Sequence, residues 1–174
     1  IISVSFNSQK TLPDCMQSVL GQSYANIEYI LVDGNSTDET VEIIKNKASE
    51  YKCIKYISEK DKGIYDALNK GVSMATGEII GFVHSDDLLA NNRIIEDIAS
   101  LFNTSNIHGV YGNLHYVSID DTDKGIRNWK SKPFNPRFLK FGWMPAHPTL
   151  FLKSSVYAEK GGFDLSFKIA ADYD

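Results

Sequence analysis

Short apolar runs alternate with helix-like patterns along the first 110 residues of this chain, and this alternation restricts the fold more than any other feature. The apolar runs occupy residues 1–6, 27–32, 54–57 and 79–83. Between them, apolar residues recur at the spacing of one helix face, as they do over residues 64–75. Four successive β-α units predict an α/β fold in which a twisted, mostly parallel sheet has helices on both faces.

Two helix starts carry a capping signal. Thr11 precedes the periodic segment 12–20, so we expect its hydroxyl to cap a helix there. Ser36 followed by Glu39 matches a capping box and predicts another helix directly after it. Both helices should then turn an apolar face toward the sheet.

The rhythm changes in the middle of the chain, where we predict a boundary between two halves of one compact domain. Residues 1–112 form an α/β half of nucleotide-binding type, and residues 113–174 form a smaller, mixed, substrate-side half. A strand at 114–119, a polar hairpin or loop at 120–125 and a short strand at 149–152 are expected in the second half. The chain begins inside an apolar run and stops without a helix-ending signal, so we expect a fragment truncated at its C-terminus.

Composition excludes several classes of protein. The net charge is −4, from 18 Lys and Arg against 22 Asp and Glu, so nucleic acid is a poor candidate partner. Apolar runs are only a few residues long, which predicts no membrane-spanning helix. Cys15 and Cys53 are far apart and lack metal-site spacing. We expect each to be a small buried hydrophobe in a protein of a reducing compartment.

Polar side chains follow each of the four predicted strands. Ligands of open α/β sheets bind at the carboxyl ends of the strands, so these side chains should share one rim. They are Asn7 and Ser8, Asp33, residues 59–62 and residues 84–87.

Two neighbouring carboxylates, Asp86 and Asp87, follow the fourth strand. Such a pair is repulsive unless a positive charge lies beside it. A divalent cation, Mg²⁺ or Mn²⁺, would supply that charge and would also bridge to the phosphates of a ligand. A solvated helix cap is the alternative interpretation, and the position after a buried strand favours the metal.

Three common motifs are missing from the chain. There is no G-x-G-x-x-G after the first strand, no P-loop and no G-x-S-x-G elbow. Dinucleotide oxidoreductases, P-loop phosphotransferases and serine hydrolases are therefore disfavoured. The remaining possibility is a site that binds a phosphate-containing ligand through carboxylates and a metal.

At these positions the chain resembles the family 2 glycosyltransferases, which have the GT-A fold. Its motifs are most similar to those of bacterial polysaccharide transferases of the colanic-acid type. The order of the matching segments is far more specific than any one of them. They are residues 4–7, 32–40, 58–71, 75–82, the aspartate pair, 161–164 and 171–174.

The resemblance implies a donor-side pocket. Asp33 would hydrogen-bond the nucleotide base or its ribose, with Ser5 and Phe6 lining the same pocket. Lys62 would face the diphosphate, and Asp86 would contact the ribose or a metal-bound water. A turn-forming role for Asp33 and a solvated loop position for Lys62 are the alternatives.

The resemblance also implies a metal ligand and an acceptor side. Asp87 would bind the metal, Asp172 would be the general base, and His147 would lie near the acceptor or the leaving group. Structural roles are the alternative for both histidines, His84 and His147. The chain departs from many relatives at His84 and at Gly34, where those relatives carry acids.

The activity implied is that of an inverting glycosyltransferase. It would move a sugar from a nucleoside diphosphate sugar to a hydroxyl of a saccharide or lipid-linked saccharide, in cell-surface polysaccharide synthesis. The implied location is the cytoplasm, including the inner face of the membrane. The alternatives are a nucleotidyltransferase, a metal-dependent hydrolase, and a nucleotide-sugar-binding module without activity.

An aromatic and basic stretch covers residues 129–143. We favour the interpretation that it walls the acceptor cleft and packs its rings inside. Peripheral contact with a membrane surface, where a lipid-linked acceptor resides, is the alternative.

Overall fold

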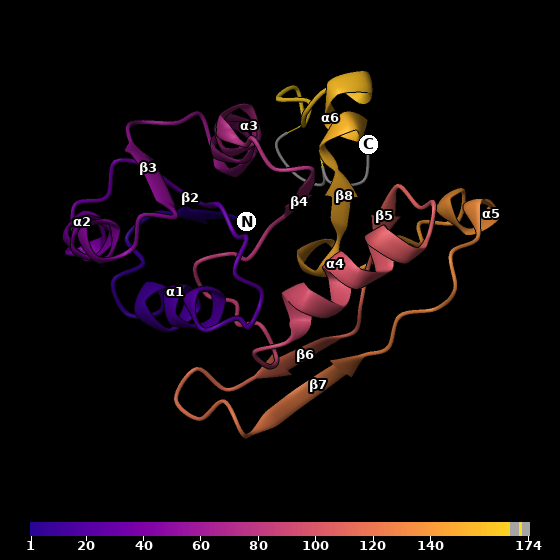
Figure 1. Ribbon diagram of the computed structural model, residues 1–174, viewed down its shortest axis with the longest axis horizontal. Coiled ribbons are helices and arrows are strands. Elements are labelled where there is room, and N and C mark those ends of the chain that lie inside the picture. Colours follow the sequence, from indigo (N-terminus) through magenta and orange to yellow (C-terminus); the bar gives the residue numbers. More distant parts are fainter. Residues whose placement is uncertain (168–170, 172–174) are drawn as a thin grey trace.

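Three parallel strands form the centre of the first half of the protein (Figure 1). The computed structural model describes residues 1–167 and 171. Strands β1 (Ile2–Ser5), β2 (Tyr29–Asp33) and β3 (Ile54–Ser58) pair in the order β1-β2-β3, in parallel throughout. Asp33 lies at the carboxyl end of β2, between Ser5 and Ser58 in register. The predicted α/β fold with a parallel sheet is confirmed.

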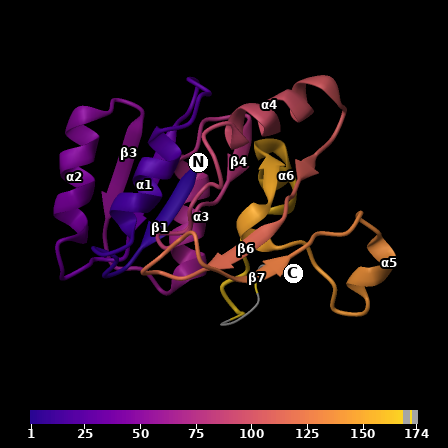
Figure 2. The ribbon, with the colours of Figure 1, turned by 90° about the horizontal axis from the view of Figure 1, so that it is seen from below.

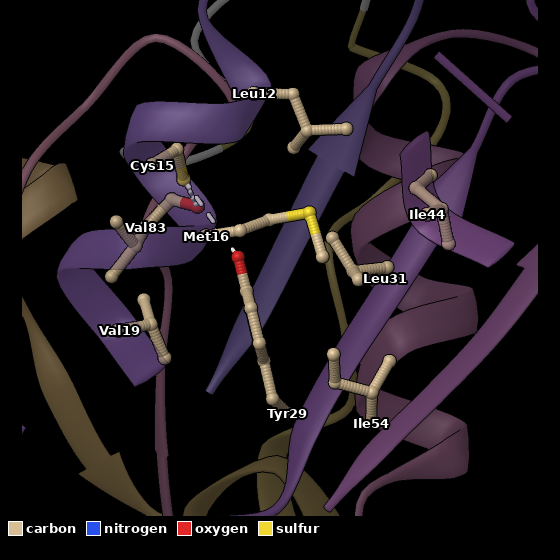
Figure 3. Close-up of a cluster of buried hydrophobic side chains, with 9 residues drawn as sticks. All are labelled: Leu12, Cys15, Met16, Val19, Tyr29, Leu31, Ile44, Ile54 and Val83. Carbon is tan, nitrogen blue, oxygen red and sulfur yellow. Dashed lines mark hydrogen bonds between the residues drawn. The ribbon is translucent and has the colours of Figure 1, made fainter. Parts of the chain in front are cut away.

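Helices cover both faces of this sheet, as Figure 1 shows for α1 and α3. The helices are α1 (Leu12–Leu20), α2 (Thr40–Glu50) and α3 (Ile64–Met74). Side chains of β2 alternate between two buried clusters because successive residues of a strand point to opposite faces. Tyr29 and Leu31 join α1 and α2 in one cluster, which Figure 3 shows. Ile30 and Val32 join α3 in the other.

The fourth strand belongs to a second, antiparallel sheet. Strand β4 (Ile79–Gly81) pairs with β8 (Phe151–Lys153), which also pairs with β5 (Gly109–Val110). A parallel bridge from Ile2 to Phe82 connects the end of β4 to the first sheet. Helix α4 (Ile94–Thr104) packs against β8 through Ile95, Phe102 and Phe151. The fourth β-α unit therefore extends the parallel sheet by one bridge only.

The second half contains the expected hairpin and several short elements. Strands β6 (Leu114–Val117) and β7 (Gly125–Trp129) form the hairpin. The remaining elements are α5 (Pro136–Leu139), the 3-10 helix η1 (His147–Thr149) and α6 (Ser154–Lys160). Within residues 1–167 and 171, no helix is long and apolar enough to cross a membrane.

The expectation that the rings of residues 129–143 pack inside the protein is wrong for three of them. The side chains of Phe134, Phe138 and Phe141 are 58%, 44% and 86% exposed. Only Phe134 has a ring neighbour among the recorded contacts, with Trp143 at 6.1 Å between centroids. The surrounding elements are too short to enclose these rings, because α5 has no buried residue and β7 has an exposed one at four of its five positions.

Both expected caps are also absent. Thr11 occupies the position before α1, but its hydroxyl makes no capping hydrogen bond, and the backbone N–H of Leu12 donates to the Ser8 carbonyl instead. Helix α2 begins at Thr40, directly after Glu39, so the capping box does not form. Ser36 is used elsewhere, because its hydroxyl and its backbone N–H both donate to Asp33.

Candidate functional site

A fully buried carboxylate, that of Asp33, organises the carboxyl ends of the parallel strands. It accepts hydrogen bonds from the Ser58 hydroxyl at 2.7 Å, the Ser5 hydroxyl at 3.4 Å, and both the backbone N–H (2.9 Å) and the hydroxyl of Ser36. A carboxylate has about four acceptor positions, so these four donors satisfy it. Asp33 therefore holds together the ends of β1, β2 and β3 and the turn that follows β2.

The loops after β1 and β2 are bound to each other on the same rim. Asn7 and Asn35 both adopt left-handed backbone conformations, with φ of 50° and 64°, which asparagine tolerates better than most residues. The backbone N–H of Asn7 donates to the Ser36 hydroxyl at 2.8 Å, and the Asn7 side chain accepts from the backbone N–H of Thr37 at 2.9 Å. Phe6 stands beside this junction with its ring 64% exposed. The structure thus brings Ser5, Phe6 and Asp33 together.

Asp61 belongs to the polar residues 59–62 expected on the rim, but its contact with the turn after β2 was not predicted. A Cβ atom added to Gly34 would lie 2.6 Å from the Asp61 carboxylate and 3.5 Å from the Phe6 ring. The Asp61 carboxylate therefore fills the space beside Gly34. The glycine directly after Asp33, together with the acidic residues Glu59 and Asp61, was the signal that could have revealed this close approach.

Lys62 lies two residues before α3, in the loop that follows the carboxyl end of β3. Its side chain is exposed, and its backbone N–H donates to the Asp66 carboxylate at 3.0 Å. Gly63 follows with φ of 122°, a left-handed conformation that allows the chain to turn into the helix. The lysine is thus on the rim, and its long side chain is available to an anionic ligand.

The aspartate pair after β4 lies in the next loop of the rim. Asp86 is exposed and Asp87 is half-buried. Burial raises the pKa of the Asp87 carboxyl; nearby His84 lowers it, and the negative charge of Asp86 raises it. A hydrogen bond of 2.9 Å between the hydroxyls of Ser8 and Ser85 ties this loop to the loop after β1.

A metal at this pair would need ligands from outside the described part of the chain. Among residues 1–167 and 171, no three His, Cys, Asp or Glu side chains gather closely enough to hold an ion. Oxygen ligands from one or two carboxylates, completed by phosphates and water, are how Mg²⁺ commonly binds. Asp87, whose ionised form is disfavoured by burial and by Asp86, fits such a shared cation.

His147 reaches the aspartate loop from the second half. Its ring stacks on Phe82, with 5.5 Å between centroids, and lies 6.0 Å from the ring of His84. Phe163 contacts it edge-on at 5.7 Å. His147 therefore lies next to the loop that carries the aspartate pair, and its role near the acceptor or the leaving group stays a prediction.

Asn69 clamps the acceptor-side motif to the donor half. From α3, its side-chain amide donates to the Phe163 carbonyl at 2.8 Å, and its side-chain oxygen accepts from the Phe163 backbone N–H at 2.8 Å. A Cβ atom at Gly162 would lie 2.1 Å from that oxygen, so the clamp requires glycine there. Asp172, the predicted general base, lies outside the described residues.

Comparison with known proteins agrees with this architecture. A family model described as glycosyl transferase family 2 matches residues 1–157. An uncharacterized glycosyltransferase of Mycobacterium tuberculosis is 33% identical over the whole chain, and a mycobacterial PGL/p-HBAD biosynthesis glycosyltransferase is 29% identical. The chain spans 65% and 66% of the lengths of these two relatives.

Two solved glycosyltransferases share the fold. TarS of S. aureus (residues 1–349), in complex with UDP-GlcNAc, aligns with 99% of this chain and 50% of its own, with a TM-score of 0.79 and 20% identity. A mannosyltransferase of Pyrobaculum calidifontis, in complex with GDP-Man and Mn²⁺, aligns with 94% of this chain and 46% of its own, with a TM-score of 0.70 and 18% identity. The match over 157 residues and the fold lead to one conclusion: the chain belongs to glycosyl transferase family 2.

Proposed function

We propose that this protein is an inverting glycosyltransferase that moves a sugar from a nucleoside diphosphate sugar to a hydroxyl acceptor. The observation that carries the proposal is the rim at the strand ends, where a buried, fully hydrogen-bonded carboxylate and two neighbouring aspartates that repel each other lie on loops that are bonded together. Such a rim offers polar contacts to a nucleoside and a place for a diphosphate with its cation. Family membership supports the reaction class.

In this proposal, the loops after β1 and β2 bind the nucleoside. Phe6 offers an exposed ring for the base, and Ser5 and Asp33 form the polar floor beside it. All four acceptor positions of Asp33 are occupied, so it would contact the base or ribose only by exchanging one serine hydroxyl for a ligand group. Asp61, next to Gly34, offers a further acceptor for a base N–H through Oδ2, since its Oδ1 already accepts from the Gly63 backbone N–H at 2.9 Å.

The diphosphate would lie between Lys62 and the aspartate pair. Asp87 would bind the divalent cation, and Asp86 would contact the ribose or a water of that cation. When bound, Mg²⁺ or Mn²⁺ offsets the negative charge that the leaving nucleoside diphosphate gains. The solved relative with GDP-Man and Mn²⁺ supports this choice of cofactor.

The acceptor would enter from the side of residues 113–174, opposite the donor half formed by residues 1–112. We assign Asp172 as the base that removes the proton of the attacking hydroxyl. A single base facing the donor sugar is what one-step displacement needs, and such a displacement inverts the anomeric carbon. His147, stacked on Phe82, would position the leaving group or the acceptor.

A saccharide or lipid-linked saccharide is the proposed acceptor, in the synthesis of a cell-surface polysaccharide at the inner face of the membrane. Support for a biosynthetic role comes from mycobacterial relatives named as PGL/p-HBAD biosynthesis glycosyltransferases. The hydrolase alternative is disfavoured, because it needs three metal ligands and the described residues bring no such group together.

The test measures binding of UDP and of GDP by calorimetry and by thermal shift, with Mn²⁺ and with EDTA. We expect one of the two nucleotides to bind and to raise the melting temperature, because a ligand that binds only the folded state stabilises it. Chelation should weaken that binding by about tenfold or more, since the cation bridges the diphosphate to Asp87. Equal affinity with Mn²⁺ and with EDTA would contradict the proposed site.

Two variants separate binding from transfer. Asp87→Asn should abolish the effect of Mn²⁺ on nucleotide affinity, whereas Asp97→Asn, at an exposed position of α4, is the matched control that should retain it. Asp172→Asn should bind nucleotide normally but lower the transfer rate by about 100-fold to 10,000-fold, the usual contribution of a positioned base. Normal transfer by the Asp172 variant would remove the base assignment.

A further inference from the structure

The charge of this protein is distributed very unevenly. Residues 124–143, which we call the basic arm, carry six basic side chains and no acidic one. The rest of the chain carries 12 basic and 22 acidic residues, a net charge of −10. Such a local excess of positive charge in an acidic protein is the electrostatic signature of a surface that meets an anionic partner.

The basic arm also exposes large apolar side chains. All six of its Lys and Arg residues are exposed. Between them, Ile126, Phe134 and Phe141 are 69%, 58% and 86% exposed. Scattered single apolar residues are normal on a protein surface, but aromatic rings concentrated on one short segment indicate an interaction surface.

The hairpin that begins the basic arm is open to solvent on both faces. Strand β7 is exposed at four of its five positions, and β6 at three of four. Arg127 lies over the rings of Tyr116 and Trp129, at 5.7 and 5.8 Å from their centroids, so one face combines positive charge with aromatic rings. An isolated two-stranded hairpin is at best marginally stable in water, which favours a partner that covers it.

The arm and the candidate site face the same way. In Figure 2, β1 and β3 run toward the lower edge of the view, and β6, β7 and α5 lie along that edge. The carboxyl ends of the parallel strands, which carry Asp33 and its partners, therefore open on the side of the molecule where the basic arm lies.

We propose that the basic arm docks the protein on an anionic phospholipid surface. Lys and Arg side chains would interact with the headgroups, while the exposed rings would enter the interface between headgroups and acyl chains, as aromatic residues do at membrane boundaries. A protein partner is less favoured, because buried centres of protein interfaces are depleted in lysine, and four of the six basic residues here are lysines.

Docking in this way would turn the candidate site toward the membrane. A lipid-linked acceptor would then reach the site without leaving the bilayer, a consequence that rests on the proposed function. Binding to lipid requires no donor sugar, so a failure to bind vesicles would leave the transfer proposal intact, and a failure to transfer sugar would leave the docking proposal intact.

The experiment is co-sedimentation of the full chain with vesicles of phosphatidylcholine, alone or with about one third phosphatidylglycerol. We expect binding to the anionic vesicles only, and loss of that binding in high salt, because salt screens charge–charge attraction. Each basic residue near an anionic surface strengthens partitioning by about fivefold. Equal binding to both vesicle types, or binding to neither, would overturn the proposal.

Charge reversal within the arm provides the specific test. Lys132→Glu with Lys140→Glu should weaken partitioning by at least about 25-fold. Lys45→Glu with Lys52→Glu, which reverses two exposed charges on and after α2, is the matched control and should weaken it far less. Phe141→Ala should weaken it several-fold in high salt as well as in low salt, because its contribution is apolar.

The four lysines substituted in the arm and control variants are all exposed, so both double variants should melt at the temperature of the unaltered protein. Equal loss of binding in the arm variant and in the control variant would mean that overall charge alone decides, and would also overturn the proposal.

Discussion

The sheet of the first half and the basic arm of the second half use apolar residues in opposite ways. In β2, all five residues are buried, and Tyr29, Ile30 and Leu31 have no exposed surface. In the basic arm, Ile126, Phe134 and Phe141 are each more than half exposed. The first region is stabilised by its own packing, whereas the second displays the same kind of side chain to the surroundings.

This difference indicates that one region stabilises the fold and the other is available to contact a partner. Apolar area removed from water contributes about 25 cal/mol per Å² to folding, so β2 and its helices supply much of the stability. The exposed rings of the arm contribute little to it, and substitutions there should alter binding without altering folding. The Asn69 clamp bonds α3 of the first half to Phe163 of the second half.

The largest effect is expected from Leu31→Ala. This side chain of β2 is fully buried against α1 and α2, and its truncation should lower the free energy of unfolding by about 2–5 kcal/mol. Phe141→Ala, at an 86% exposed position, should change it by less than about 0.5 kcal/mol. Urea denaturation of both variants measures the change in the free energy of unfolding. Similar losses in the two would contradict the contrast between the regions.

A smaller effect is expected from Asn69→Ala. The substitution removes two hydrogen bonds to the Phe163 backbone and should destabilise the protein by about 1–3 kcal/mol. Proteolysis should become faster at the segment around Phe163, because that segment would lose its attachment to α3. Ser73→Ala, on the same helix, is the control and should leave the cleavage rate unchanged. Unchanged cleavage in the Asn69 variant would show that the aromatic contacts of Phe163 hold the segment alone.

Ser58→Ala tests the organisation of the rim. It removes the 2.7 Å hydrogen bond from the Ser58 hydroxyl to the buried Asp33 carboxylate and should cost about 1–2 kcal/mol of stability. Nucleotide affinity should fall as well, since Asp33 would be less well held. Ser49→Ala, whose hydroxyl bonds only within α2, is the matched control for both measurements. A Ser58 variant with unaltered stability would indicate that water replaces the lost donor.

The smallest effect concerns Cys15 and tests whether the core is closed. Burial raises the pKa of its thiol to about 11, and hydrogen bonds with Ser3 and Tyr29 oppose the rise. Above about pH 9 the unfolded thiol ionises while the folded one stays neutral, so stability should fall as the pH rises toward 11. Cys15→Ala should flatten this decline in a pH series of thermal melts.

Thiol labelling gives a second measurement of the same property. In a Cys53→Ser variant, the only remaining thiol is Cys15, and it should react with a disulfide reagent only after unfolding. Rapid reaction in the folded state would contradict the closed core.

Helix and strand positions were largely predictable from the sequence, because the apolar spacing of 3.6 or 2 residues is a local property. The segment 12–20 became α1 with the same bounds, and the alternation in β2 follows from its apolar run. The capping signals at Thr11 and Ser36 were misleading for a physical reason. A serine hydroxyl bonds to whichever acceptor is nearest, and for Ser36 that is a buried carboxylate from the preceding strand.

The site was predictable as a set of residue types and not as a set of contacts. Polar residues after each strand are visible in the sequence, and so is the aspartate pair. That Asp61 fills the space beside Gly34, and that His147 stacks on Phe82, depends on how loops far apart in the chain approach one another.

The sequence by itself determined the β-α order, the buried faces of the helices and the family, since each follows from residue spacing or from motifs along the chain. Only the tertiary structure decided that β4 leaves the parallel sheet for β8, that Asp33 is saturated by serine donors, and that the rings of the basic arm stay outside. These outcomes depend on which side chains are buried by neighbouring elements. Burial depends on how segments that are distant in the sequence pack together, so it is a property of the whole folded chain.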